Sequence, residues 1–311
     1  MLLAAGLFLL LTFGSAAARS GASDGLRLLG ELLIPSLLPF FVAAGLLNRL
    51  GFAHSLGRRL TKTLGRLFRI SGCGCTVFLL GLSGGYPLGA ATVADLYQNR
   101  QITRGEACHL LRFCDNTGPA FALGAVGAAF GNTRAGFYLW IVHGLSAVIL
   151  GFMLRPKVSP IPRGNAATGE PGFAGAFTGA IQGAVQSVIS IAGFVVFFCA
   201  VLGVMESVSL VSRTAAALHA LTGLDKQWWL CLLNGFLELS SAVGQMRGMA
   251  CTGTNLAAAA FVLSWGGLCI HCQAAAVLQR AGLDAKERLG GKLLQGALSA
   301  VLAFLFHPLC F

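Results

Sequence analysis

One acidic side chain lies inside an apolar stretch in the second half of the chain. Glu238 occurs in the segment LNGFLELSSAVGQ at residues 233–245, with Leu on either side of it. Ionisable groups in hydrocarbon are costly, and they normally face a partner, a ligand or a water-filled cavity. Two interpretations stay open. We favour Glu238 as the polar anchor of a binding site; the alternative is a structural group that bonds backbone ends at a facing hairpin.

Three further breaks interrupt apolar segments: SGGYP at 83–87, DNTGP at 115–119 and GG at 266–267. Each break frees backbone N–H and C=O groups, and the half-helix ends carry partial charges from which membrane proteins build midplane binding sites. The alternative is that Gly and Pro only kink and pack these helices. We predict that a ligand contacts the residues at and near the breaks: Glu238, Ser83, Gly85, Tyr86, Asn116, Thr117, Gly118 and Gln273.

The remaining polar residues in apolar segments have weaker functional interpretations. Arg112 and Asp115 are three residues apart and are expected to pair, more as an interfacial salt bridge than as ligand contacts. His143 is expected to be a hydrogen-bonded helix residue rather than a proton carrier. Four amides either line a polar path or join helices to one another: Gln182, Gln186, Asn234 and Gln245.

The segment CIHC at 269–272 contains residue types that bind soft metals. It lies in a Cys-rich apolar stretch and lacks a second pair at zinc spacing, so packing is the favoured interpretation. The sequence also lacks a nucleophile elbow, a phosphate loop and a zinc-protease helix. We therefore expect no metal site, no cofactor and no enzymatic activity.

The composition excludes a water-soluble globular protein. Hydrophobic residues make up 56% of the 311 residues and charged residues only 11%, whereas soluble domains are about 25% charged. The net charge of +11 does not indicate nucleic-acid binding, because the basic residues lie between apolar segments and are not interleaved with stacking aromatics. An integral membrane protein of the cell membrane is the class that remains, and the lipid bilayer is its first partner.

Apolar stretches long enough for a bilayer of about 30 Å alternate with interrupted ones. Residues 1–27 are predicted to be a transmembrane helix, or a signal peptide, followed by an outer loop. The first unit, 28–154, then contains a span at 28–47, an amphipathic surface helix at 52–70, a re-entrant hairpin at 73–97, a broken crossing at 104–130 and a span at 135–154. A Pro- and Gly-rich cytoplasmic linker at 155–174 ends it.

The second unit, 175–311, repeats this order after a shift of about 154 residues. Its predicted elements are a span at 179–205, a surface stretch to 227, a hairpin at 228–248, a broken crossing at 255–279 and a span at 289–306. Each unit crosses the membrane an odd number of times, so the two units have inverted topology. Most Lys and Arg residues fall in loops that this topology places inside. The predicted fold is an all-α polytopic bundle of two inverted repeats, each with a re-entrant hairpin and a broken helix.

Several of these segments resemble one protein family. The matching segments are IPSLLPFF at 34–41, GGYPLGA at 84–90, NTGPAF at 116–121 and GFLE at 235–238. They are similar to the sporulation integral membrane protein YlbJ family, which carries the nucleoside-recognition Gate domain. The resemblance implies a multi-pass membrane protein of an endospore-forming bacterium that is needed for the spore cortex.

The function we expect is a transporter or channel for a small polar solute, with its site between the two hairpins. Nucleosides are the solute class that the Gate name implies. The alternative is a non-transporting membrane scaffold for cortex assembly. Expected protein partners are a second copy of the chain or other sporulation membrane proteins.

Overall fold

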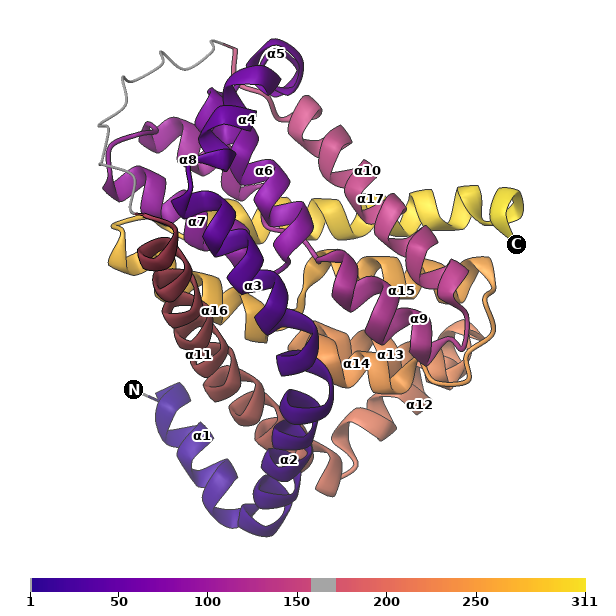
Figure 1. Ribbon diagram of the computed structural model, residues 1–311. Coiled ribbons are helices and arrows are strands. Elements are labelled where there is room, and N and C mark those ends of the chain that lie inside the picture. The colour runs from indigo at the N-terminus through magenta and orange to yellow at the C-terminus, as the bar shows by residue number, and fades with distance from the viewer. Residues whose placement is uncertain (1, 158–171) are drawn as a thin grey trace.

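The computed structural model describes residues 2–157 and 172–311, which fold into helices joined by loops (Figure 1). The all-α fold class is therefore confirmed. Of the predicted linker at 155–174, residues 158–171 lie outside the described part. The first half contains α1 (Leu2–Phe13), α2 (Ser15–Leu28), the π-helical turn η1 (Leu29–Leu33), α3 (Ile34–Arg49), α4 (Phe52–Leu60), η2 (Thr61–Gly65), α5 (Arg66–Phe68), α6 (Gly72–Gly84), α7 (Leu88–Gln98), α8 (Arg104–Leu111), η3 (Ala120–Val126), α9 (Gly127–Ala129) and α10 (Thr133–Met153).

The second half begins with the longest helix of the described chain and follows the predicted order. Its elements are α11 (Phe173–Ser207), α12 (Leu210–Thr222), α13 (Lys226–Leu237), α14 (Leu239–Gln245), α15 (Gly253–Trp265), α16 (Gly267–Arg280) and α17 (Lys286–Cys310). Polar N-caps start several helices at loop ends. The hydroxyl of Thr103 accepts from Glu106 N at 3.2 Å before α8, and that of Thr252 accepts from Asn255 N at 3.3 Å before α15.

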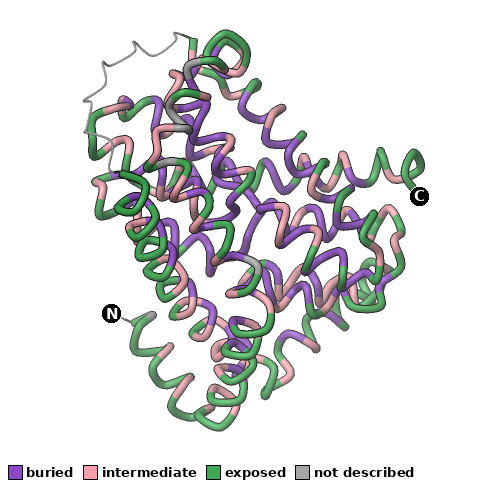
Figure 2. Tube along the Cα trace, in the orientation of Figure 1, coloured by how far each residue is buried: buried purple, intermediate pink, exposed green. Residues whose placement is uncertain are grey.

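Four described helices are long and apolar enough to cross a membrane: Thr133–Met153, Phe173–Ser207, Gly253–Arg280 and Lys286–Cys310. Two bent pairs pass the same test together, Ala4–Phe13 with Ser15–Leu33 (95°) and Thr61–Phe68 with Gly72–Gly84 (87°). Large apolar side chains are exposed along α10, α11 and α17, as on a lipid-facing surface, and the buried residues lie at the centre (Figure 2). The chain is a multi-pass membrane protein.

The predicted outer loop up to residue 27 is wrong, because residues 15–28 form α2. This helix packs along α11 through its small residues (Figure 1). A Cβ on Gly21 would lie 2.3 Å from the carbonyl oxygen of Cys199, and one on Gly25 would lie 3.1 Å from Val196 Cα. The Ala- and Gly-rich composition that resembles a loop thus permits a close helix contact, as small residues do in membranes.

The two predicted hairpins are both present. Helices α6 and α7 fold back on each other at residues 85–87, and α13 and α14 do so at Glu238. In the second hairpin, Gln227 Nε2 donates to Gln245 O at 2.7 Å, which joins the two ends far from the tip. The broken crossings are also present: residues 112–119 separate α8 from η3, and Gly266, with φ of +83°, separates α15 from α16.

Candidate functional site

The tip of the first hairpin packs directly on the first break, backbone against backbone. A Cβ on Gly81 would lie 1.7 Å from Cys114 O, and one on Gly89 would lie 2.6 Å from Asp115 Cα. Gly85 has a φ of +85° and touches Gly118, whose added Cβ would lie 3.0 Å from Gly85 N. The glycines of both segments are therefore required for this close approach.

The second hairpin contacts the second break in a comparable way. A Cβ on Gly267 would lie 3.1 Å from the carbonyl oxygens of Gly235 and Leu237. Trp265 Nε1 donates to Phe236 O at 3.1 Å, which pairs one carbonyl at the end of α13. Each half thus places its hairpin tip on its own break, in agreement with the predicted repeat.

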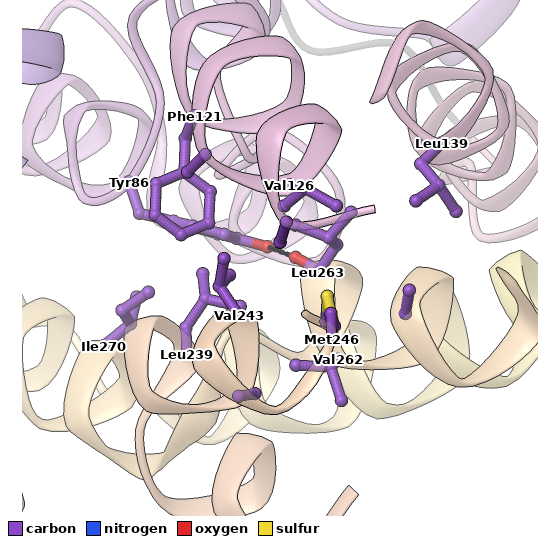
Figure 3. Close-up of a cluster of buried hydrophobic side chains, with 14 of the residues drawn as sticks. Tyr86, Phe121, Val126, Leu139, Leu239, Val243, Met246, Val262, Leu263 and Ile270 are labelled. Carbon is purple, nitrogen blue, oxygen red and sulfur yellow. Dashed lines mark hydrogen bonds between the residues drawn. The ribbon is translucent and has the colours of Figure 1, made fainter. Parts of the chain in front are cut away.

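Two hydroxyl groups from the first half pair the backbone of the second break. Tyr86 Oη donates to Leu263 O and Ser264 O, both at 3.1 Å, and Thr117 Oγ1 donates to Leu263 O at 2.8 Å. These carbonyls belong to the last turn of α15, where intrahelical donors are lacking. Figure 3 shows Tyr86 directed at Leu263 between the two halves. All four breaks therefore converge on one region.

A small cavity lies at this meeting point, called here the central cavity. Its volume is about 50 Å³, which is enough for a few water molecules and too small for a larger solute. Its polar lining comes from Glu238, Ser240, Tyr86, Thr117 and Gln273. The other lining residues are Gly85, Gly118 and the apolar side chains Leu33, Leu37, Phe121, Ile191, Val195, Leu239 and Ile270.

The central cavity brings together six of the eight residues predicted to contact a ligand: Gly85, Tyr86, Thr117, Gly118, Glu238 and Gln273. The other two do not line it. Ser83 is exposed, and its hydroxyl donates to Leu79 O at 2.8 Å within α6. Asn116 is fully buried and faces α17, where its side-chain oxygen accepts from Gln295 Nε2 at 3.1 Å. The backbone turns at each break, so that neighbouring side chains point in different directions, and those of Ser83 and Asn116 point away from the cavity.

Glu238 is the N-cap of α14. Its Oε1 accepts from Ser240 N at 3.0 Å and its Oε2 accepts from Ser241 N at 2.6 Å. The carboxylate therefore bonds the backbone of its own hairpin, and not of the facing one. Each oxygen retains lone-pair capacity, and the residue lines the central cavity although it is only 2% exposed.

Asp115 pairs a backbone N–H at the start of the second helix of the first hairpin, although it lies outside that hairpin, in the first break. Its Oδ1 accepts from Ala90 N, in the first turn of α7, at 3.2 Å. Its Oδ2 accepts from Arg288 Nε of α17 at 2.7 Å, and both side chains are buried. The expected pair between Arg112 and Asp115 is therefore wrong, since Arg112 Nε instead donates to Glu287 at 2.8 Å.

A buried polar stripe on α17 is absent from the sequence-based site. Arg288, Lys292, Gln295 and Ser299 are all fully buried. Their spacing of four, three and four residues places them on one face of the helix. The sequence contains this periodicity, but the span expected from hydropathy begins at residue 289, which leaves Arg288 in the loop before it and Lys292 without an assigned role.

His143 is hydrogen-bonded within the bundle, as expected. Its Nε2 accepts from Thr117 N at 3.0 Å, so Nδ1 carries the proton and donates to Ser264 Oγ at 2.7 Å. The hydroxyls of Ser264, Ser299 and Ser146 continue the chain at 2.7 Å each. This network joins α10, α15 and α17 at the level of the breaks.

The other amides and the CIHC segment have varied surroundings. Asn234 and Gln245 line another cavity, described below, whereas Gln182 and Gln186 are exposed on α11. Gln273 Nε2 donates to Cys269 Sγ at 3.3 Å, a weak acceptor. Among the residues that the structure describes, no group of three His, Cys, Asp or Glu side chains is arranged to hold a metal ion.

Three cavities follow one another along α11. The first, called the α7-side cavity, is about 380 Å³ and is lined by α11 residues between Gly179 and Ser187, with Arg49 and Asp95 opposite. The central cavity comes next, at Ile191 and Val195. The third, called the α12-side cavity, is about 280 Å³ and is lined by α11 residues between Cys199 and Glu206, with Asp24, Asn234 and Gln245 among its other lining residues.

Comparison with known proteins gives one curated relative and a fold. No protein-family model matches the chain. The chain is 28% identical to the sporulation integral membrane protein YlbJ of Bacillus subtilis (strain 168) over an alignment of 318 positions, gaps included, which covers 93% of this chain and 77% of that protein. Two solved structures of CNTnw variants, both in an outward-facing state, have TM-scores of 0.57 and 0.50 at 14% and 12% identity. The alignments with these two structures cover 98% of this chain, and they cover 86% and 85% of the respective CNTnw chains. The chain is thus an integral membrane protein that is similar to a sporulation protein and shares the fold of a transporter.

Proposed function

We propose that this chain transports a small polar solute, of which nucleosides are one class, across the membrane of a sporulating bacterium. The observation that carries the proposal is the series of three cavities along α11, in which the smallest lies between the tips of the two hairpins. A large cavity on each side of a small central one is the arrangement expected of a closed transport path. The hairpin tips then separate the two outer cavities.

The lining of the central cavity indicates the chemistry of the solute. The lining combines Leu, Ile, Val and Phe side chains with the carboxylate of Glu238 and the amide of Gln273. Ligand sites commonly combine apolar walls with a few convergent polar groups. A flat ring with hydrogen-bonding edges fits this combination, which agrees with the nucleoside class. Such a solute is larger than the cavity, so the tips move apart when it binds.

The physiological setting is proposed from sequence similarity. The likeness to YlbJ supports three proposals for this chain: that it belongs to that sporulation family, that it contains a Gate domain, and that it acts in making the spore cortex. The shared fold with CNTnw supports transport as the type of activity. We propose no enzymatic activity and no cofactor.

Ligand-induced stabilisation of the detergent-purified protein tests this proposal. The panel consists of nucleosides, nucleobases, small carboxylates and cortex precursors. A ligand at 100 times its Kd raises the free energy of unfolding by about 2.7 kcal/mol at a single site. The shift should disappear in Gln273→Leu, which removes the amide at the cost of only a weak bond to sulfur, and in Glu238→Gln. Ser83→Ala, at the same level but off the cavity, is the matched control and should keep the shift.

Uptake of the stabilising solute into proteoliposomes is the second measurement. Uptake that is reduced in Gln273→Leu and normal in Ser83→Ala supports transport through the central cavity. A folded protein that responds to no member of the panel and takes up none of them argues against it.

A membrane scaffold for cortex assembly is the second candidate, and one observation favours it. Both oxygens of Glu238 already accept from backbone N–H groups of α14, so the carboxylate is explained without any ligand. A scaffold would tolerate Gln273→Leu and Glu238→Gln during sporulation and would be recovered in a stable complex with another sporulation protein.

A further inference from the structure

The ammonium group of Lys292 lies in a cage of oxygen atoms at the first break. Its Nζ donates to Asp115 O at 2.7 Å, to Gln295 Oε1 at 2.5 Å and, more weakly, to Asn116 Oδ1 at 3.5 Å. The side chain is fully buried. The face of the Tyr86 ring lies 5.1 Å away and adds a cation–π contact.

The surrounding network fixes the orientation of both amides. Gln295 Nε2 donates to His143 O at 3.3 Å, and Asn116 Nδ2 donates to Phe113 O at 2.8 Å. Their oxygens must then face Lys292. Three oxygen acceptors, one of them at 3.5 Å, thus face the three N–H groups that an ammonium can donate.

The nearby carboxylate does not serve Lys292. Asp115 Oδ2 is paired with Arg288, and its Oδ1 accepts from Ala90 N. The atoms around Nζ are a backbone carbonyl in an unwound segment and two amide oxygens, which are neutral hard ligands. Unwound carbonyls beside the end of a half-helix are also where membrane transporters hold Na⁺ or H⁺.

We propose that Lys292 is a tethered cation: its ammonium fills an oxygen cage that would otherwise take a free monovalent cation. The protein then needs no bound Na⁺ or K⁺ at the first break in order to hold its fold. It follows that solute uptake does not depend on Na⁺ at this position, and this consequence rests on the proposed function. The occupancy of the cage by Lys292 does not rest on it.

Paired substitutions of Lys292 test the proposal through thermal unfolding in detergent. Lys292→Ala empties the cage, and Lys292→Met fills the same space without a charge. Each is measured in choline chloride, NaCl, KCl, methylammonium and ethylammonium chloride at equal ionic strength. Lys286→Ala is the control, because this lysine lies on the same helix with its side chain 87% exposed.

The expected result separates the variants by their response to small cations. The wild type and Lys286→Ala should have the same melting temperature in every salt. Lys292→Ala should melt several degrees lower in choline and should recover in Na⁺ or in a primary ammonium. Lys292→Met should stay low in all of them. If neither variant survives purification in choline, ethylammonium present from solubilisation onward should recover Lys292→Ala alone.

Three results would overturn the proposal. They are a wild-type melting temperature that rises in Na⁺ or K⁺ relative to choline, a Lys292→Met variant as stable as the wild type, and equal responses of Lys292→Ala and Lys292→Met to every cation. None of these readouts requires transport. A failure to detect uptake therefore bears on the proposed function and leaves the cage to be judged by stability alone.

Discussion

Replacing Gly81 by Ala tests the backbone contact between the first hairpin and the first break. The added Cβ would lie 1.7 Å from Cys114 O, and real Cβ atoms essentially never come within 3.0 Å of another heavy atom. The segment must therefore move by about 1.3 Å or more. Because Asp115 is the next residue, the same movement disturbs its 2.7 Å contact with Arg288.

The magnitude follows from these two effects. Overpacking typically costs about 1–3 kcal/mol, and separating a buried ion pair costs about 3–5 kcal/mol. Since the second loss is partial here, we expect Gly81→Ala to lower the free energy of unfolding by about 3–5 kcal/mol. At about 2–4 °C per kcal/mol for larger domains, the melting temperature should fall by roughly 6–20 °C.

Thermal unfolding of the purified protein, followed by tryptophan fluorescence, is the assay. Gly193→Ala is the matched control, because it lies on the membrane helix α11 and an added Cβ there meets no atom within 4 Å. It should melt at or slightly above the wild-type temperature, as Gly→Ala changes in unstrained helices do. A Gly81→Ala variant that melts within a degree or two of the wild type would refute the close packing of the hairpin on the break.

The remaining predictions concern single side chains of the site, and unfolding in detergent measures the first two. Asp115→Asn leaves Arg288 buried without a counter-charge and should cost about 3–5 kcal/mol, whereas a loss below about 1 kcal/mol would contradict the pairing. Tyr86→Phe leaves Ser264 O without its tyrosine donor and should cost about 1–3 kcal/mol. Glu238→Ala should cost about 0.5–2 kcal/mol through the lost cap and should speed amide hydrogen exchange at 239–245, with Glu238→Gln less affected. Unchanged exchange there would argue against the cap.

The sequence predicted the hairpins and breaks because their signals are local. The length of an apolar run and the Gly and Pro at its centre decide whether a segment crosses or turns back, and the run at 73–97, with GGYP at 84–87 near its centre, carries both signals. Residues 15–28 were mispredicted because their weak hydropathy resembles a loop. As a helix they pack closely on α11, where a Cβ on Gly21 would lie 2.3 Å from Cys199 O, and this contact is with a distant segment.

Within the site, the identity of the residues was easier to predict than their direction. Tyr86 and Ser83 belong to the same predicted break, yet only Tyr86 reaches the central cavity, because Ser83 lies in the last turn of α6 and donates to Leu79 O. The pair of Asp115 and Arg288 joins residues 173 positions apart, and local patterns carry no information about such a partner. Lys292 belongs to a polar stripe with helical spacing on α17, and the average hydropathy of that apolar segment conceals the stripe.

The different origins of the two hairpin caps give the hairpins unequal freedom to move. Helix α14 takes its capping carboxylate from the residue at its own start, so the second hairpin can shift as one piece with its first amides still paired. Helix α7 depends on Asp115, which is held by Arg288 from α17. Displacing the first hairpin therefore exposes an unpaired backbone group and disturbs an ion pair. The first hairpin is therefore fixed to the rest of the bundle, and the second hairpin is the one that can move relative to it.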